Sequence, residues 1–387
     1  RCSRRMALAS RFCGAIKSAE RANDGISLAR ALSLEERRNR FVGPLVEAVV
    51  SSPSGDARKV LGSRLRSSWA DAVVFAVSAM VAERDDRLLD ACSAQFEAVK
   101  AVVALTREAE TNWTIPALHG VARDAYRLAR AYHRSQSAGC SASRADAIQP
   151  LTDLQVVLRN AFGAVAHHRS ADPETSKRQG ALYIAILLFR ICFRVGNLNS
   201  GAVVVRTIEG GRGFPDLSQF PKAQQVTYCF FRGRLAVFNQ DMQTARMFLV
   251  DALRLCYRGA LRCRQSIVEA LLPVQLYFGL VPRRQLFERY DLRPYESLVT
   301  AFRNGDVRGF ESALDANRVF FMRRGVYLQL ETLQLHVYQS LFRRAARLSD
   351  CGTRVPLDVF CRAMECVGVD GDDDHVECIL ANLAYRG

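Results

Sequence analysis

The sequence predicts a mainly α-helical protein: an α-solenoid of tetratricopeptide-like helical repeats, followed by a C-terminal winged-helix subdomain whose β-wing is truncated. Apolar residues recur at helical spacing through nearly all of the 387 residues, and polar or Gly- and Pro-rich segments separate these stretches. A hydrophobic content of 49% with 24% charged residues is enough to form a large core. This composition excludes a chain that is disordered throughout.

The region 1–140 is predicted to be an N-terminal helical region. Apolar residues at helical spacing indicate helices over 34–50, 69–83, 88–107 and 115–133. Loops are expected at 51–55 (SSPSG) and 135–143 (SQSAGCSAS), where Ser and Gly gather. The second loop separates two helical stretches, so we place the end of the N-terminal region there.

The region 141–322 is predicted to be a helical-repeat solenoid. Its first helices are expected over 151–168, 177–195, 198–208 and 222–238. Helix 177–195 is apolar on nearly all faces, which predicts that neighbouring helices bury it. The Gly-rich segment 209–221 lacks the residue order and the strand–helix context of a phosphate-binding loop, so we interpret it as a connector.

A repeat-like pattern begins near residue 226. Small residues and an aromatic residue recur on both sides of a short polar turn at 239–241, as in one tetratricopeptide-type helix pair. A weaker copy follows at 298–314, where Asn304, Gly305 and Asp306 supply the turn. Such pairs cannot bury their apolar faces alone and therefore stack. The residues of the first pair are Gly233, Ala236, Ala245, Phe248 and Ala252.

The last region, 323–387, has a different pattern. One long amphipathic helix is expected over 323–348, then a short helix over 357–366 and a final helix over 375–385. The acidic run 372–374 suits the positive end of the last helix. This order of helices is that of an incomplete winged helix, and the β-hairpin wing would follow Gly387.

The chain is strongly basic, with 54 Lys and Arg against 39 Asp and Glu and a formal net charge of +15. Only five of the basic residues are Lys, and the charge is spread evenly, with +7 in 1–150 and +8 in 151–387. Two interpretations stay open. The surface is generically basic, or it meets an acidic partner such as nucleic acid or an acidic protein segment.

The cysteines predict neither disulfides nor a metal centre. The twelve Cys include no CxxC pair and mostly lie in apolar segments, as expected of free thiols in a reducing compartment. The group Cys361, Cys366, His375 and Cys378 matches no usual zinc spacing. The longest uncharged apolar run has 13 residues, whereas a membrane-spanning helix needs ~17–25. We therefore expect no metal, no cofactor and no membrane contact.

Enzyme signatures are absent from the sequence. It contains no HExxH, GxSxG or GxxxxGK[ST] motif. The adjacent His167 and His168 would point in two directions on a helix, and helix capping accounts for the acidic run 372–374 better than cation binding does. We predict a protein that is not an enzyme.

Several strings of residues resemble those of a known family. They are QQVTY at 224–228, GR at 233–234, EALLPV at 269–274, FFMRRGVY at 320–327 and ECILANL at 377–383. With helical repeats that run into a winged helix, they resemble the PCI-domain family. Within it they are most similar to the PCI subunits of the nuclear mRNA-export complex called transcription and export complex 2, with a signalosome-associated PCI relative as a close cousin. The resemblance covers about residues 150–387.

The resemblance implies a non-enzymatic scaffold in the nucleus, at the nuclear pore, with a cytoplasmic location left open. Its implied partners in a hetero-oligomer are a large export-complex scaffold subunit with a PCI-like domain, a small acidic disordered subunit of the Sem/Dss type, and RNA or DNA on a basic winged-helix platform. The alternative is a PCI subunit of a proteasome-lid or COP9-signalosome-type assembly that makes only protein contacts.

Two sets of residues are candidates for these contacts. For nucleic acid they are Arg323, Arg324, Arg343, Arg344, Arg347 and Arg362, because the planar Arg side chain binds phosphate with two donors. For protein partners they are Arg254, Arg258, Arg262, Arg264, Phe320, Phe321 and Tyr327. The alternatives are a solvated helix end or exposed face for the arginines and a buried core for the aromatic residues.

Overall fold

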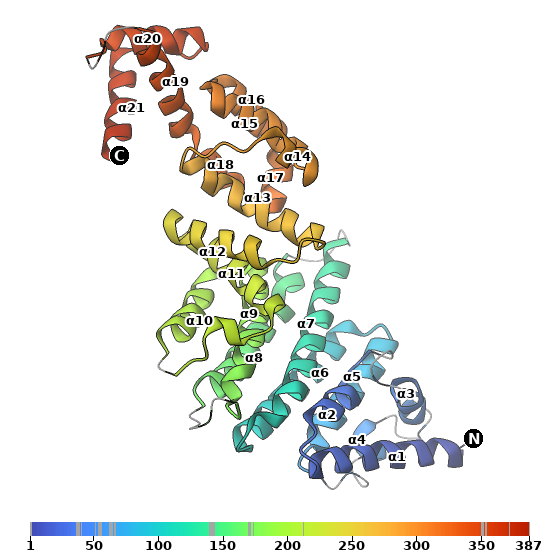
Figure 1. Cartoon of the computed structure of the whole chain (residues 1–387). Coiled ribbons are helices and arrows are strands. Elements are labelled where there is room, and N and C mark those ends of the chain that lie inside the picture. The colour runs from blue at the N-terminus through green and yellow to red at the C-terminus, as the bar shows by residue number, and fades with distance from the viewer. Residues whose placement is uncertain are drawn as a thin grey trace. The chain divides into compact units, whose positions relative to one another are not determined.

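The computed structural model is all helical in the residues that it describes, namely 2–35, 39, 41–50, 52, 56–61, 65, 67–138, 144–168, 172, 174–211, 213–349, 352, 354–370 and 372–386. The chain divides into two compact units, Arg1–Gln224 and Gln225–Gly387. Within each unit, helices that follow one another in sequence pack side by side, as a helical solenoid requires (Figure 1). The boundaries placed near residues 140 and 322 stay predictions.

The N-terminal unit contains ten α-helices and three short 3₁₀ segments in its described residues. The 3₁₀ segments are Asn112–Thr114, Lys177–Gly180 and Leu217–Gln219. The α-helices are α1 (Cys2–Arg21), α2 (Gly25–Leu32), α3 (Val42–Val50), α4 (Ala57–Leu61), α5 (Ala70–Arg84), α6 (Leu88–Glu108), α7 (Ile115–Ala138), α8 (Arg144–Ala166), α9 (Ala181–Val195) and α10 (Leu198–Gly210).

Most of the helices predicted in this unit are confirmed. Helices α5, α6 and α7 match the predictions for 69–83, 88–107 and 115–133, and α9 is buried on nearly all faces as expected. The prediction for 34–50 is wrong in its first part, because α3 begins only at Val42. Asn39 is the physical reason: its amide nitrogen donates to the carbonyls of Ala31 and Ser33, which holds the chain in a turn after α2.

The C-terminal unit begins within α11 (Lys222–Phe238) and continues through a single series of helices. These are α12 (Met242–Leu255), α13 (Leu261–Tyr277), α14 (Arg284–Arg289), α15 (Glu296–Asn304), α16 (Val307–Ala316), α17 (Arg318–Arg324), α18 (Tyr327–Glu331), α19 (Gln334–Leu348), α20 (Leu357–Cys366) and α21 (Asp373–Arg386), with a 3₁₀ turn at Arg293–Tyr295. One apolar core runs from Val268 of α13 to Ile379 of α21, so the last three helices are part of the same body as the repeats.

Both predicted repeat pairs are present. At the crossing of α11 and α12, a Cβ on Gly233 would lie 2.6 Å from Cγ of Leu249, so only glycine permits this approach. The second pair is α15 and α16, where Gly305 takes a left-handed φ of 71°. Asp306 then accepts the N–H of Gly309 at 2.8 Å and caps α16.

The single long helix predicted over 323–348 is wrong, because the segment forms the end of α17, then α18 and α19. Gly325 has a left-handed φ of 69° and ends α17. Its N–H donates to the carbonyl of Met322 at 3.0 Å, and the N–H of Val326 donates to that of Phe321 at 3.1 Å. This paired cap stops the helix. The predicted short helix 357–366 is confirmed as α20.

The three helices expected in a winged helix are therefore α19, α20 and α21. Asp372 accepts the N–H of His375 at 2.9 Å, so it caps α21 as the sequence suggested. No strand occurs between Gln225 and Arg386 in the described residues, and the wing stays a prediction. In the described part of the chain, no helix is long and apolar enough to cross a membrane.

Candidate interaction surface of the C-terminal unit

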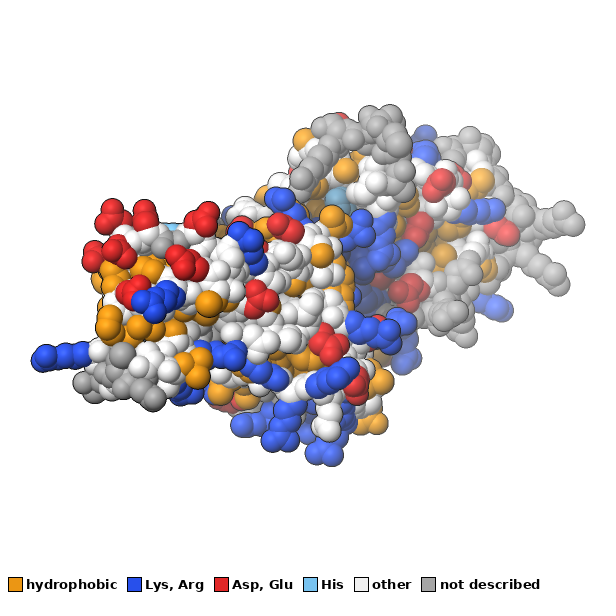
Figure 2. Space-filling model, turned by 90° about the horizontal axis from the view of Figure 1, so that it is seen from above, with side chains coloured by type: hydrophobic (Ala, Val, Ile, Leu, Met, Phe, Trp, Pro, Cys, Tyr) orange, Lys and Arg blue, Asp and Glu red, His pale blue; other side chains and the backbone are white. Residues whose placement is uncertain are grey.

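The charge of the C-terminal unit is divided between neighbouring segments. Residues 318–354 contain seven Arg and two acidic residues, whereas 357–386 contain two Arg and seven acidic residues. Figure 2, which looks down on the end of the molecule where α20 lies, shows acidic side chains gathered there. A polyanion is therefore repelled by α20 and α21 and attracted to the segment from α17 to α19.

The predicted nucleic-acid residues differ in what they contact. Arg343 and Arg347 on α19 are exposed and form no ion pair with any described residue. Arg344 donates from Nη1 to the carbonyl of Asn304 at 2.8 Å, which ties α19 to the end of α15. Arg362 forms a bidentate salt bridge with Asp358, which lies one turn earlier on α20. Arg362 thus has its charge matched on an acidic helix, whereas Arg323, like Arg343 and Arg347, is exposed and forms no ion pair with any described residue.

Arg324 takes part in a buried charge cluster. Its Nη1 lies 3.5 Å from Oε2 of Glu269, whose side chain is only 6% exposed, while Arg324 itself is 43% exposed. Burial raises the pKa of Glu269, and the positive charge of Arg324 partly offsets this rise. Burial, followed by the negative charge of Glu269, also raises the pKa of Tyr295. We call Glu269, Tyr295 and Arg324 the buried cluster.

The buried cluster contains polar atoms that no described group satisfies. Oε1 of Glu269 and the hydroxyl of Tyr295 are buried and lack a hydrogen-bond partner among the described residues. Arg234 of α11 approaches the same place, since its Nη2 lies 3.1 Å from the position that a Cβ on Gly325 would take. Burial lowers the pKa of Arg234. The cluster holds α17 against α13 at the cost of burying charge.

Arg264 has an internal role as well. Its Nη1 donates to the carbonyls of Leu253, at 3.1 Å, and Cys256, at 3.0 Å, and its Nε donates to the Tyr290 hydroxyl at 3.1 Å. It therefore satisfies the C-terminal end of α12 and fixes the turn to α13. The other three predicted arginines of this group, Arg254, Arg258 and Arg262, are exposed.

Burial limits which of the predicted aromatic residues a partner can contact. Phe321 is fully buried in the core, so it is not available to a partner. Phe320 is half-buried, and the Arg324 guanidinium lies 5.4 Å from its ring centroid. Tyr327 is half-buried and has Arg318 5.6 Å from its ring centroid.

Three exposed apolar side chains close in sequence to these aromatic residues were not among the predicted contacts. Val319 and Met322 on α17 are 62% and 58% exposed, and Leu328 on α18 is 67% exposed. Once Phe321 is assigned to the core, helical spacing puts Val319 and Met322 on another face of α17, so the signal was present in the sequence. We call Val319, Met322 and Leu328 the exposed apolar face.

Comparison with known proteins identifies the family. No family model matches the chain. It is 31% identical to Enhanced ethylene response protein 5 of Arabidopsis thaliana over 97% of this chain and 88% of the relative. It is 30% identical to PCI domain-containing protein 2 of Danio rerio over 72% of this chain and 68% of the relative. The chain belongs to the PCI-domain family. It is also 26% identical to the CSN12 homologue of Yarrowia lipolytica over 72% of this chain and 71% of that protein.

The similarity to the plant relative extends over the residues that form the buried cluster. It covers nearly the whole chain, beyond the 150–387 that the matched strings indicated. PCI-domain relatives indicate a scaffold in a hetero-oligomeric complex. Residues from three of the matched strings, Arg234, Glu269 and the pair Arg324–Gly325, meet at the buried cluster.

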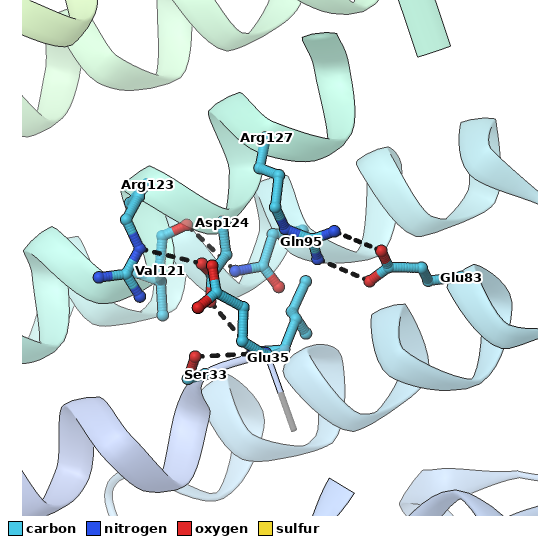
Figure 3. Close-up of polar contacts among 9 residues, drawn as sticks. Ser33, Glu35, Glu83, Gln95, Val121, Arg123, Asp124 and Arg127 are labelled. Atoms are coloured by element: carbon cyan, nitrogen blue, oxygen red, sulfur yellow. Dashed lines mark hydrogen bonds and ion pairs between the residues drawn. The ribbon is translucent and has the colours of Figure 1, made fainter. Parts of the chain in front are cut away.

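The N-terminal unit of this PCI-domain chain has a buried polar network of its own (Figure 3). Asp124, with a side chain that is 0% exposed, accepts the N–H of Leu34 at 3.0 Å and Nε of Arg123 at 3.2 Å. Arg127 and Glu83 form a two-donor pair at 2.5 and 2.7 Å. Burial raises the pKa of Asp124. These contacts join the segment after α2 to α7, and α5 to α7, and they serve the fold.

The histidine and cysteine side chains outside the buried cluster form no metal site in the described residues. His119 on α7 has its Nε2 2.9 Å from the carbonyl of Gly180, and burial lowers its pKa to about 4, so it is a neutral structural donor. No described group of three or more His, Cys, Asp or Glu could hold a metal ion, and this includes Cys361, Cys366, His375 and Cys378.

Proposed function

We propose that this chain is a non-enzymatic scaffold subunit of a nuclear mRNA-export complex, located in the nucleus at the pore. Its partners are a large scaffold subunit with a PCI-like domain, a small acidic disordered subunit, and RNA or DNA. The observation that carries the proposal is the exposed apolar face on α17 and α18, in a segment that also contains Arg318, Arg323 and Arg324.

The exposed apolar face has the composition of a protein-docking site. Its three side chains are 58–67% exposed, and Arg318, Arg323 and Arg324 lie in the same short segment. No acidic residue occurs between Arg318 and Leu330. Interfaces are enriched in Met, Arg and aromatic residues and depleted in acidic ones. Apolar side chains with a rim of one charge fit a partner segment that is apolar and acidic.

The nucleic-acid contact is assigned to the end of α19. Arg343 and Arg347 are exposed, outside the acidic α20–α21 segment, and one helical turn apart. That spacing allows both to contact one phosphate backbone.

Protein docking is tested by affinity capture from nuclear extract with the full chain as bait. Met322→Asp puts a like charge against an acidic partner and should abolish capture of a PCI-like scaffold subunit. Met247→Asp on α12 is the matched control, because Met247 is 53% exposed and Met322 is 58% exposed. Equal capture by both variants would exclude the exposed apolar face.

Nucleic-acid binding is tested by titrating RNA with the assembled complex at several salt concentrations. Arg343→Glu with Arg347→Glu should lower the salt slope by about 0.7 for each lost phosphate contact on a single strand. Arg362→Glu is the control, since Asp358 already matches that charge. A flat salt dependence in the wild type would refute the nucleic-acid part of the proposal.

The alternative function is a PCI subunit of a proteasome-lid or COP9-signalosome-type assembly. The similarity to a protein named as a CSN12 homologue supports it. The same capture experiment separates the two functions. Recovery of lid or signalosome subunits without an export scaffold would favour the alternative.

A further inference from the structure

The turn between α12 and α13 presents an aromatic ring among arginines. Tyr257 is 79% exposed and Leu261 is 58% exposed. Arg254 precedes Tyr257 in the sequence, Arg258 and Arg262 follow it, and all three are exposed. No acidic residue occurs between Asp251 and Glu269. We call Arg254, Tyr257, Arg258 and Arg262 the turn cluster.

The turn that carries this cluster is held in place from inside. Arg264 binds the carbonyls of Leu253 and Cys256, as described above, and the N–H of Ala260 donates to the carbonyl of Tyr257 at 3.1 Å. A Cβ on Gly259 would lie 2.6 Å from Cε1 of Tyr257, so the ring rests against the glycine. A ring supported on one side and exposed on the other is a ready stacking surface.

The electrostatics of the turn favour an anion. The side chain of Arg254 is 77% exposed and only loosely paired, with its Nη1 3.8 Å from Asp251. Helix α13 starts there with no acidic residue in its first turn and no side-chain cap. The positive end of the helix dipole therefore adds to the arginine charges.

We propose that the turn cluster is a contact for single-stranded nucleic acid, in which a base stacks on Tyr257 and the flanking phosphates bind Arg258 and Arg262. The proposal shares with the proposed function only the premise that the C-terminal unit binds nucleic acid. It assigns a contact separate from the arginines of α19.

The size of the turn decides between a nucleic acid and an acidic protein segment. A stable protein interface needs about 800 Å² on each partner. The five-residue turn and the first residue of α13 offer only two exposed apolar side chains, Tyr257 and Leu261, which is too little to bury an amphipathic helix. One base needs only one ring face and one or two cations.

The test measures binding of a fluorescent single-stranded oligouridylate of roughly ten nucleotides by the full chain. Tyr257→Ala should weaken binding about 5- to 100-fold, and Tyr257→Phe should stay within about twofold, because stacking needs the ring and not the hydroxyl. Gly259→Ala should weaken binding without changing any charge, because the added methyl displaces the ring. Arg258→Gln and Arg262→Gln should each lower the salt slope by about 0.7.

The matched control is Tyr385→Ala, because Tyr385 is 92% exposed but lies on the acidic α21. It should leave binding unchanged. Binding that is insensitive to Tyr257→Ala but lost with Arg343→Glu and Arg347→Glu would overturn the inference and leave the proposed function intact. Absence of binding in the wild type would refute the nucleic-acid contacts of both. If the Tyr257 variants impair only binding of a Glu-rich peptide, the turn is a protein contact and the inference is wrong.

Discussion

Replacing Arg324 with Ala removes the counter-charge of the buried Glu269. At their separation of 3.5 Å, Coulomb's law gives about 1 kcal/mol in water and about 5 kcal/mol at the effective dielectric near a protein surface. Because 43% of Arg324 is exposed, solvent screens much of this interaction, and we take about 2 kcal/mol. Arg324→Ala should lower the free energy of unfolding of the C-terminal unit by that amount at pH 8.

The raised pKa of Glu269 determines how the cost of Arg324→Ala changes with pH. A folded-state pKa raised above the ordinary 4.5 means that Glu269 contributes most to stability below pH 4.5 and that this contribution is lost as pH rises through the raised value. The protonated carboxyl needs no counter-charge. The cost of Arg324→Ala should therefore be largest at pH 8 and shrink toward pH 4, and Glu269→Gln should remove most of it at pH 8.

The assay is urea unfolding followed by two probes. Both Trp residues, Trp69 and Trp113, lie in the N-terminal unit, so Trp fluorescence reports that unit, whereas far-UV circular dichroism reports both. Arg324→Ala should shift the dichroism transition and leave the fluorescence transition in place. The double variant with Glu269→Gln completes a thermodynamic cycle. An Arg324→Ala cost that is equal in both backgrounds and at both pH values would refute the cluster.

Three further predictions test a helix crossing, a buried carboxylate and a helix cap. Gly233→Ala should destabilise the C-terminal unit by about 1–3 kcal/mol in urea unfolding because the methyl group overpacks the α11–α12 crossing. Gly163→Ala, whose methyl group meets nothing within 4 Å, should be neutral or stabilising and serves as its control. Asp124 has a pKa raised above 3.8, so the stability of the wild type relative to Asp124→Asn should fall as pH rises through the raised value, measured by Trp fluorescence. A constant difference would contradict the raised pKa. Asp372→Ala should cost α21 about 0.5–2 kcal/mol and speed its hydrogen exchange. Protection of α21 by added Ca²⁺ in the wild type would instead indicate a cation site.

Much of the fold could be predicted from the sequence, because for most helices the apolar periodicity stops where Pro, Gly or polar residues mark the end of the helix. Helix α20 matches its prediction, since Pro356 precedes it and the turn at Val367 and Gly368 follows it. The prediction of one helix over 323–348 failed because the apolar periodicity continues across Gly325. Only the left-handed backbone, which forms the cap after α17, reveals that the helix ends there.

The site was harder to predict, because it depends on which way each charged side chain points. Glu269 is a charged residue on a helix, and such residues are expected to be exposed, yet its side chain is 6% exposed. Arg264 lies close in sequence to Arg258 and Arg262 but points inward to two carbonyls that only the folded turn brings together. Sequence spacing therefore found the cluster of arginines but not the division of roles within it.

The contacts of the arginines also account for part of the unusual composition, in which 49 of 54 basic residues are Arg. A helix leaves its last carbonyls without partners, and a fold made of many short helices has many such ends. Three of these ends, in both units, are bound by an Arg from elsewhere in the same unit: Arg178 donates to Ala166 after α8, Arg264 to Leu253 and Cys256 after α12, and Arg344 to Asn304 after α15. The planar five-donor guanidinium can reach two carbonyls at once, which suits it to this role better than the lysine ammonium. A net charge of +15 is therefore a poor measure of the surface offered to a polyanion. The arginines to test are those without an acceptor among the described residues, such as Arg258, Arg343 and Arg347.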